Sequence, residues 1–357
     1  MTSGLSGEPL SLWEKADLFS GNLSILGAAL YSAITGIFRG KSGTKQFGLH
    51  ISHAVVRRAV RRLSSRQLQS QNLSTLHGYE AYAKQQNFTP ETATLSHGAT
   101  GLWIGSKDAK NVVVYYHGGG FVLPAVAGHF SFLHGLVEEL NKNGHDVAIF
   151  MLAYTLSPPA RYPTHLIQAV EALRYILDQG DRDPSNVVVG GDSAGGNLAL
   201  SVLLHITHPH PDIAPLSLRD GVELAGVFGF APWVSFALDG ESIKTNVNKD
   251  IIPPEGLKHW SEEYLGKRRE GDAWSEPSKA PLEWWADVKA KQLLILAGGD
   301  EILFSAIEQF VKKIKTVLPK TTYVVGYEET HVTPVYSGTG PEGQQARGLS
   351  NWLGANL

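Results

Sequence analysis

The residues with the clearest chemical signature lie in the hexapeptide GDSAGG at residues 191–196, which fits the pattern G-x-S-x-G. An apolar run typical of a strand precedes it and an apolar run typical of a helix follows. This context places the central serine on a sharp strand-to-helix turn. Side chains at Gly191 and Gly195 would clash as the turn closes, and the helix N-terminus favours negative charge near Ser193. We therefore expect Ser193 to be a nucleophile; the alternative is a glycine-rich turn with an incidental serine.

A second glycine-rich motif, HGGGF at residues 117–121, comes directly after a predicted strand. Glycines let backbone N–H groups point into a site that side chains would otherwise fill. Such donors stabilise the oxyanion of acyl transfer, and an HGGG loop supplies them in lipases and esterases. A phosphate-binding loop is the alternative, but the chain has no G-x-x-x-x-G-K-[ST] pattern and the loop has no lysine or arginine.

In this order and spacing, the two motifs together resemble those of the hormone-sensitive-lipase-like family of α/β-hydrolases. The resemblance covers about residue 111 to the C-terminus. It includes YTLSP at 154–158 and YP at 162–163, which are similar to the family's Y-R-L-A-P-E and F-P stretches. Thr155 and Pro159 depart from this pattern, because the family usually has arginine and glutamate there. The N-terminal third and the acid region are most similar to fungal members, several of which act in secondary metabolism.

The resemblance implies an α/β-hydrolase fold, in which a mostly parallel central sheet carries helices on both faces and lies under a helical cap. It also implies that backbone N–H groups bind the oxyanion, namely those of Gly119, Gly120 and Ala194. Neither a metal nor an organic cofactor is needed for this chemistry.

A serine nucleophile needs a general base, and the base needs an acid that orients it. The chain order in this fold is serine, acid, histidine. Of the 14 histidines, only His331 follows the last predicted strand in a loop, where the family keeps its base. The acid should follow the strand predicted at 292–297, where Asp300 and Glu301 are adjacent. Aligning Leu303 with the leucine of the family pattern D-P-L-x-D-E predicts Glu301, with Asp300 as the alternative.

The implied reaction is the cleavage of a carboxylic ester through an acyl-enzyme. Glu301 would hold His331 in the tautomer that takes the proton from Ser193, which attacks the ester carbonyl, and water would release the acid. Acyl transfer to a hydroxyl or amine, or ring closure or opening in a biosynthetic pathway, would use the same intermediate. A non-catalytic binding module is disfavoured, because both motifs and the histidine are intact.

Three other histidines form a cluster after the elbow helix and raise the question of a metal site, namely His205, His208 and His210. Prolines on both sides of His210 and the lack of further ligands favour a surface loop instead. His50 and His53 are expected to lie on the surface of an N-terminal helix. We therefore predict no metal site.

The elements that must position these residues follow from the hydrophobic pattern. Apolar β-branched or aromatic runs predict strands at residues 112–116, 146–153, 186–190, 222–230, 292–297 and 322–327. Apolar residues at three- and four-residue spacing predict helices at 46–63, 163–177, 194–206, 304–317 and 343–353. The alternation predicts a mainly parallel sheet. We expect a catalytic domain at 101–357, a cap insertion at about 233–289, and an N-terminal helical cap region at 1–100.

The N-terminal region contains an uncharged stretch, residues 18–38, which has about the length of a membrane span. Its apolar residues recur at helical spacing along one stripe, formed by Leu23, Leu26, Leu30, Ile34 and Phe38. Such a stripe suits a helix that lies on a protein core, so we expect a cap over Ser193 in a cytoplasmic protein. Weak contact with a membrane surface is the alternative, aided by a basic helix face with Arg57, Arg58, Arg61 and Arg62. A solvated face is the simpler interpretation of these arginines.

Composition limits the number of domains and excludes several classes of protein and site. The chain has 357 residues, 43% hydrophobic and 18% charged, with a net charge of −3. This supports one large α/β domain or two small ones, and it excludes a disordered chain. The near-neutral charge gives no reason to expect nucleic acid as a partner. The absence of cysteine excludes a disulfide framework, a zinc–thiolate site and a cysteine nucleophile.

The substrate depends on the cap. We predict that Phe121 and Trp233 bind substrate, and further apolar side chains are candidates for the same pocket, namely Leu123, Trp274, Trp284 and Trp285. The alternative is that most of them are core or interface residues. A small-to-medium hydrophobic ester is the expected substrate, because lipases for long triglycerides usually have a more exposed hydrophobic lid.

Overall fold

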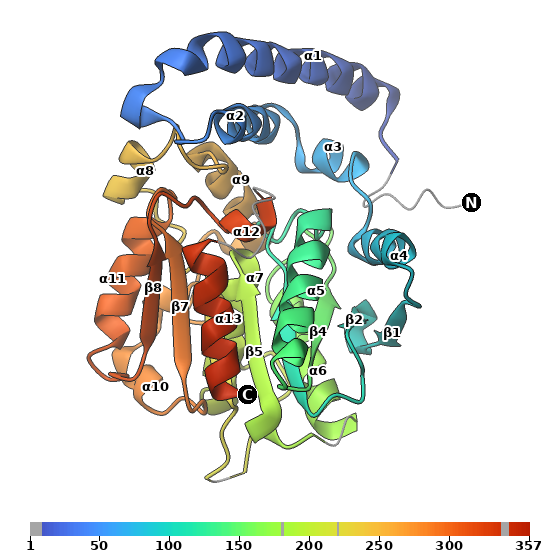
Figure 1. Ribbon diagram of the computed structural model, residues 1–357, viewed down its shortest axis with the longest axis vertical. Coiled ribbons are helices and arrows are strands. Elements are labelled where there is room, and N and C mark those ends of the chain that lie inside the picture. The colour runs from blue at the N-terminus through green and yellow to red at the C-terminus, as the bar shows by residue number, and fades with distance from the viewer. Residues whose placement is uncertain (1–8, 180–181, 220, 337–342) are drawn as a thin grey trace.

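The computed structural model describes residues 9–179, 182–219, 221–336 and 343–357. An eight-stranded sheet forms its centre, in the order β1-β2-β4-β3-β5-β6-β7-β8 (Figure 1). The strands are β1 Glu91–Thr94, β2 Thr100–Ile104, β3 Asn111–Tyr116, β4 Val147–Ala153, β5 Val187–Asp192, β6 Gly226–Phe230, β7 Leu293–Gly298 and β8 Thr322–Gly326. β1 and β2 pair antiparallel, as do β2 and β4, whereas β3 to β8 form parallel pairs. The predicted, mostly parallel sheet is therefore confirmed.

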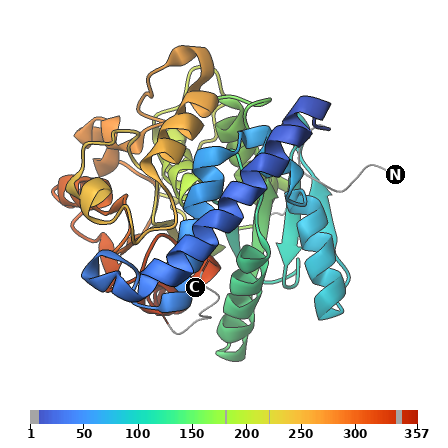
Figure 2. The ribbon, with the colours of Figure 1, turned by 90° about the horizontal axis from the view of Figure 1, so that it is seen from above.

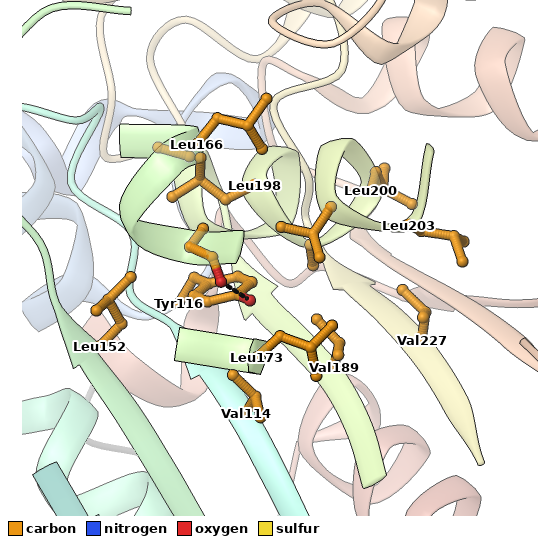
Figure 3. Packing of buried hydrophobic residues seen from close by; sticks show 14 of the residues in the cluster. Val114, Tyr116, Leu152, Leu166, Leu173, Val189, Leu198, Leu200, Leu203 and Val227 are labelled. Atoms are coloured by element: carbon orange, nitrogen blue, oxygen red, sulfur yellow. Dashed lines mark hydrogen bonds between the residues drawn. The ribbon is translucent and has the colours of Figure 1, made fainter. Parts of the chain in front are cut away.

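Helices cover both faces of the sheet, as its continuous apolar strands require. One face carries α5 Ala127–Lys142 and α13 Gln344–Asn356, and the other carries α6 Thr164–Arg174, α7 Ala194–Thr207 and α11 Phe304–Ile314. Figure 3 shows side chains of β3, β5, α6 and α7 interlocked on the second face, where Tyr116 Oη donates a 2.8 Å hydrogen bond to the Ala169 carbonyl. The helix predicted at 163–177 ends at Arg174 and continues as a π-helical turn, Tyr175–Gln179.

Four helices precede the sheet: α1 Leu12–Thr35, α2 Phe47–Arg62, α3 Ser65–Ser70 and α4 Thr75–Gln86. Figures 1 and 2 show α1 lying across the top of the molecule as an outer layer over α2. The expected N-terminal helical region, residues 1–100, also contains a strand of the sheet. Glu91 to Thr94 pair with β2, so the sheet begins ten residues before the predicted boundary. The first eight residues of the expected cap region lie outside the described residues.

The orientation of α1 is also the reverse of the one expected. The stripe predicted to pack on a protein core faces outward, with Leu26 and Leu30 57% and 58% exposed and Ile34 70% exposed. The side that meets the protein carries small residues. A Cβ at Gly21 would lie 2.5 Å from Leu63, so the helix approaches α2 closely at that point. The missing side chain, and not the apolar stripe, determines which face is buried.

The segment predicted as a cap insertion, residues 233–289, contributes helices to two opposite ends of the molecule (Figure 1). α9 Pro254–Leu265 lies under α2, where a Cβ at Gly256 would be 2.4 Å from Val60, and α8 Glu241–Thr245 lies beside it above α11 (Figure 1). α10 Leu282–Ala286 instead lies at the opposite end, beside α11. The outer layers on this side are therefore α1, then α2, then α9. A short helix after β8, α12 Thr333–Tyr336, completes the described elements near the site.

Candidate active site

Ser193 lies at the end of β5, directly before α7. Its backbone angles, φ 54° and ψ −116°, are in a strained region that non-glycine residues rarely adopt. The Ser193 N–H donates a 2.8 Å hydrogen bond to the Phe230 carbonyl, which holds the turn against β6. A Cβ at Gly195 would lie 1.8 Å from the Tyr116 carbonyl oxygen. The structure thus has the sharp turn that the motif predicts, and it shows why a side chain is excluded beside it.

The glycine loop is tied to this turn by Asp192, which the sequence analysis used only as a spacer in the motif. The Asp192 carboxylate is fully buried and accepts hydrogen bonds from Gly118 N at 2.8 Å and Tyr115 Oη at 2.7 Å. His129 Nε2 lies 3.3 Å from its other oxygen. Burial alone would raise the pKa of Asp192, but His129 and Tyr115 more than offset this and the pKa is lowered. The only sequence signal for this role was the presence of an acidic residue inside an apolar motif. A carboxylate buried there is costly unless it accepts hydrogen bonds.

The three N–H groups predicted to form the oxyanion hole belong to this loop and to the first residue of α7. Among the described residues, none of the N–H groups of Gly119, Gly120 and Ala194 donates to a protein acceptor. Gly119 and Gly120 both have positive φ values, 109° and 62°. A Cβ at Gly120 would be 2.3 Å from the Trp260 ring of α9. These N–H groups are therefore free of protein acceptors in the described part of the chain, and α9 packs directly on the loop at Gly120.

Glu301 and His331 follow β7 and β8, at the same carboxyl edge of the sheet as Ser193. Glu301 Oε2 lies 2.9 Å from His331 Nδ1, and both side chains are almost completely buried. The predicted contact between these two residues is confirmed. His331 Nε2 has no hydrogen-bond partner among the described residues, so no bond joins it to Ser193 Oγ in this state. Such bonds are often long in free enzymes and tighten when substrate binds.

Asp300 points elsewhere. Its Oδ1 accepts a 2.7 Å hydrogen bond from Lys249 Nζ, and its N–H donates to the Glu329 carbonyl. Adjacent residues of an irregular turn face different directions, so only one of the two carboxylates reaches the histidine.

The charges of the Glu301–His331 pair are coupled. Burial raises the pKa of Glu301, although the hydrogen bond from His331 works against this. Burial lowers the pKa of His331, but the hydrogen bond and charge of Glu301 more than offset this, so that its pKa is raised. The pair therefore takes up a proton at a higher pH than a free histidine does. The other ring nitrogen of His331, Nε2, has no hydrogen-bond partner among the described residues.

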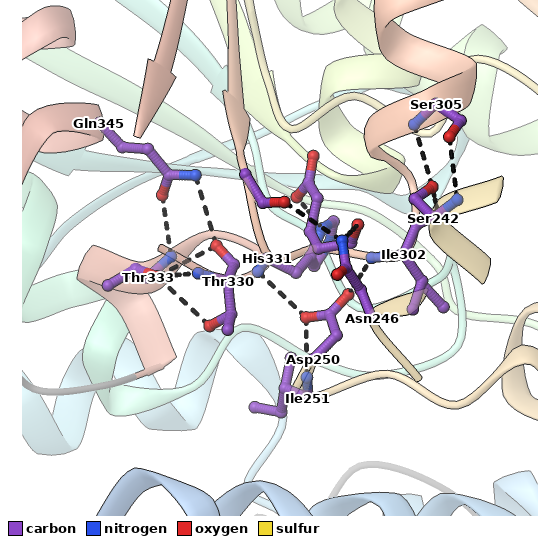
Figure 4. A network of polar contacts seen from close by, with 12 residues as sticks. Ser242, Asn246, Asp250, Ile251, Ile302, Ser305, Thr330, His331, Thr333 and Gln345 are labelled. Atoms are coloured by element: carbon purple, nitrogen blue, oxygen red, sulfur yellow. Dashed lines mark hydrogen bonds and ion pairs between the residues drawn. The ribbon is translucent and has the colours of Figure 1, made fainter. Parts of the chain in front are cut away.

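A polar network that sequence reasoning missed surrounds the pair (Figure 4). Asp250 Oδ1 accepts from His331 N at 3.1 Å, and Asp250 Oδ2 accepts from Ile302 N at 2.7 Å. Asn246 Nδ2 donates to the Glu301 carbonyl at 3.0 Å. No sequence motif marks these residues, because they lie in the segment that was assigned as an insertion and these partners are 52 to 81 residues away in the chain.

Phe121 and Trp233, the predicted substrate-binding residues, both lie beside the turn. Trp233 N donates a 3.0 Å hydrogen bond to the Ser193 carbonyl, and the two aromatic rings stack with centroids 6.0 Å apart. Tyr264 of α9 stacks on Phe121 at 3.8 Å. α9 thus contributes Trp260 and Tyr264, two aromatic residues that the sequence analysis did not single out. The helical spacing of i and i+4 within 254–265 was the available signal.

The other tryptophans proposed for this pocket have partners elsewhere. Trp284 stacks on His208 and Trp274 Nε1 donates to the His208 carbonyl, at the end of α7 opposite Ser193. Trp285 packs against Phe310 of α11. They belong to the core and to a packed loop, which was the alternative interpretation.

The expectation of a surface loop for the histidine cluster was wrong for two of its members. His205 and His210 are buried, and His205 Nδ1 accepts a 3.0 Å hydrogen bond from His210 N. Among the described residues, no group of three potential ligands forms a metal site. His53 is buried too, where its Nδ1–H donates to the Lys249 carbonyl at 2.9 Å.

The solvated face expected for the arginines of α2 holds for Arg58 and Arg61, which are exposed, but not for Arg57. Arg57 is 5% exposed and donates to the Asp250 carbonyl. The others bond within the chain: Arg58 to Ser24, Arg61 to Glu255, and Arg62 to Asp17. These arginines join α2 to α1, to α9 and to the loop under it.

A sequence profile of the alpha/beta hydrolase fold family matches residues 113–334. Steryl acetyl hydrolase 1 of Saccharomyces cerevisiae is 25% identical over 68% of this chain and 56% of its own length. An acetyl-hydrolase of Streptomyces hygroscopicus is 27% identical over 72% of this chain and 79% of its own. The chain spans about half the length of several curated relatives that it matches.

The solved structure of an esterase from the bacterial hormone-sensitive lipase family superposes with a TM-score of 0.64 at 22% identity. The match covers 87% of this chain and 99% of that one, so the two share a fold. The family profile covers more than half of the chain, and the sheet, the serine turn and the glycine loop described above are those of the same fold. The chain therefore belongs to the α/β-hydrolase fold family.

Proposed function

We propose that this protein is a serine hydrolase that cleaves carboxylic esters through an acyl-enzyme. The observation that carries the proposal is the buried Glu301–His331 hydrogen bond of 2.9 Å at the sheet edge where Ser193 occupies its strained turn. A nucleophile, a base and an orienting acid at one edge are the parts that acyl transfer requires.

The steps follow from the contacts. His331 Nδ1–H donates to the Glu301 carboxylate, which leaves Nε2 as the lone-pair nitrogen that accepts the proton of Ser193. Ser193 Oγ attacks the ester carbonyl, and the free N–H groups of Gly119, Gly120 and Ala194 bind the oxyanion. The alcohol leaves with the proton from Nε2. Water, deprotonated by the same nitrogen, then releases the acid and restores the serine.

The cover over the site favours a small acyl or alcohol group next to Ser193. The nucleophile is 4% exposed, and the Trp260 ring lies directly against Gly120 of the glycine loop. Phe121, Trp233 and Tyr264 close the neighbouring side with stacked rings. Two relatives are named for the hydrolysis of acetyl groups. We infer that the substrate is a small-to-medium hydrophobic ester and that acetyl is the preferred acyl group.

A panel of p-nitrophenyl esters from acetate to decanoate tests this function. We expect turnover of the short esters, its loss in Ser193→Ala, and labelling of Ser193 alone by an organophosphate. Adding an acceptor alcohol and analysing the products separates hydrolysis from acyl transfer. Labelling of no serine, or unchanged turnover in Ser193→Ala, would overturn the proposal.

We propose in addition that the outer face of α1 contacts a membrane surface. Among the described residues, Leu12–Phe38 is the one helix that is long and apolar enough to cross a membrane. Its acids Glu14 and Asp17 are paired with Arg66 and Arg62. Lys15 and Lys41, near its two ends, are exposed. An apolar face flanked by unneutralised lysines suits anionic lipid headgroups.

The contacts with α2 favour a helix that lies on the membrane over one that spans it. A spanning α1 would give up the 2.5 Å Arg62–Asp17 ion pair and the packing at Gly21. We expect the full chain to sediment with vesicles of phosphatidylcholine and phosphatidylserine. The variant Leu26→Asp/Leu30→Asp should remain in the supernatant, and Leu73→Asp, an exposed leucine elsewhere, should sediment like the original. Equal sedimentation of all three proteins would exclude this surface, and dimerisation lost in the first variant would assign it to a second copy of the chain.

A further inference from the structure

The loop before α9 holds a buried carboxylate between the acid and the base. Asp250 is 0% exposed, and its two oxygens accept from three backbone N–H groups: Ile251 and His331 on Oδ1, at 2.7 and 3.1 Å, and Ile302 on Oδ2, at 2.7 Å (Figure 4). Ile302 directly follows Glu301. The Asp250 side chain thus bonds to the backbone of two loops that follow different strands: the loop after β7, which holds Glu301, and the loop after β8, which holds His331.

The same loop is held from outside by the N-terminal helices. Arg57 of α2 donates to the Asp250 carbonyl, and His53 donates to the Lys249 carbonyl at 2.9 Å. Thr44 Oγ1 donates to the same Lys249 carbonyl at 3.1 Å. Arg57 and His53 are both buried, and a buried guanidinium is retained only where its bonds repay the lost hydration.

We propose that Asp250 is a positioning residue that sets the distance between Glu301 and His331, and that α2 holds Asp250 in place through Arg57. The inference rests on the proposed function, since it assigns these residues to the same acyl-transfer site. It makes the N-terminal region part of the catalytic apparatus as well as its cover. The physical basis is that the Asp250 carboxylate bonds only to backbone N–H groups, one in each of the two loops and one at Ile251, so its loss would shift loops without removing a reacting group.

The charged surroundings of Asp250 predict a second signature. Arg57 and His53 face it from α2, the Lys249–Asp300 ion pair lies beside it, and Glu301 and His331 face it from the two loops. Burial lowers the pKa of Arg57 to about 10, so that it remains charged at neutral pH. The negative charge of Asp250 helps to raise the pKa of His331. Replacing Asp250 by asparagine should therefore move the acid limb of kcat/KM to lower pH.

The experiment measures p-nitrophenyl acetate turnover by the full chain carrying Asp250→Asn, Arg57→Ala, or both. Misplacement of reacting groups by about 1 Å costs on the order of 10²-fold in rate, so we expect kcat to fall ~10- to 100-fold in Asp250→Asn while KM changes little. Arg57→Ala should lower kcat less. The double variant should be no slower than Asp250→Asn, because Arg57 acts through Asp250.

Arg58→Ala is the matched control, since Arg58 lies on the same helix but contacts Ser24 of α1. Its kcat should be that of the original protein. Unfolding midpoints are measured for every variant, and kinetics are taken below them. Effects that multiply in the double variant, or an unchanged pH limb in Asp250→Asn, would overturn the positioning role. Ser193→Ala that keeps its activity would instead defeat the proposed function itself, so the two failures are distinguishable.

Discussion

Replacing Glu301 by glutamine tests the assignment of the acid most directly. The carboxylate is completely buried, and its only hydrogen bond to a side chain within the described part of the chain is the 2.9 Å contact with His331 Nδ1. Glutamine has nearly the same shape but no charge. If its amide nitrogen faces Nδ1, His331 is held in the wrong tautomer, with its proton on Nε2, and cannot accept from Ser193. If its oxygen faces Nδ1, the charge that stabilises the imidazolium is still lost.

The expected loss is large because the Glu301 carboxylate is completely buried and bonded directly to His331 Nδ1. In a serine triad, the equivalent change lowers kcat by about 10⁴-fold, which corresponds to ~5.4 kcal/mol of transition-state stabilisation. We expect ~10³- to 10⁴-fold for Glu301→Gln. The control is Asp300→Asn, which removes only the partly exposed ion pair with Lys249 and should change kcat by less than about 3-fold.

The assay is kcat and kcat/KM for p-nitrophenyl acetate, with circular dichroism to confirm that both variants fold. A Glu301→Gln enzyme within about tenfold of the original, or an Asp300→Asn enzyme slower than Glu301→Gln, would refute the assignment. The second result would mean that the Asp300 carboxylate turns toward His331 during catalysis.

Three further predictions concern the base, the nucleophile and the cover. The base must be unprotonated to accept a proton, so activity should be lost as pH falls. Because the pKa of His331 is raised, the midpoint of this loss in kcat/KM should lie above the ordinary histidine value of ~6.5. A flat profile from pH 5 to 8 would contradict a histidine base. Ser193→Ala and His331→Ala should each lower kcat by at least ~10⁴-fold without unfolding the protein, checked by single-turnover kinetics. Trp260→Ala should raise kcat/KM for octanoate relative to acetate at least several-fold, because it removes the ring packed on Gly120; an unchanged chain-length preference would show that the acyl group binds elsewhere.

The sequence alone predicted those features that depend on residues close together in the chain. The strands β3, β5 and β7 are short apolar runs because both faces of each are covered, and their positions were predicted to within two residues. The serine turn needs small residues immediately around it, so its motif is contiguous in the chain. His331 was recognisable as the candidate base because it follows the last strand, at the edge where the parallel strands end.

Other features depended on which groups the fold brings together. The stripe on α1 was assigned to the core because apolar side chains are usually buried. The helix instead buries Gly21 and Ser32, which allow a close approach to α2. β1 was missed because its short, mostly polar sequence has no strand signal of its own and it is stabilised by pairing with β2.

The sequence by itself determined the candidate groups for the proposed chemistry: a serine in a strand-to-helix motif, a glycine loop, and a histidine with two candidate acids. Only the tertiary structure decided which acid meets the histidine, because Glu301 and Asp300 are neighbours that turn toward His331 and Lys249 respectively. It alone revealed Asp250, two of whose partners are 52 and 81 residues away. The physical reason is that hydrogen bonds between distant loops impose no spacing on the sequence; they require only that the fold place a buried acceptor where several donors converge.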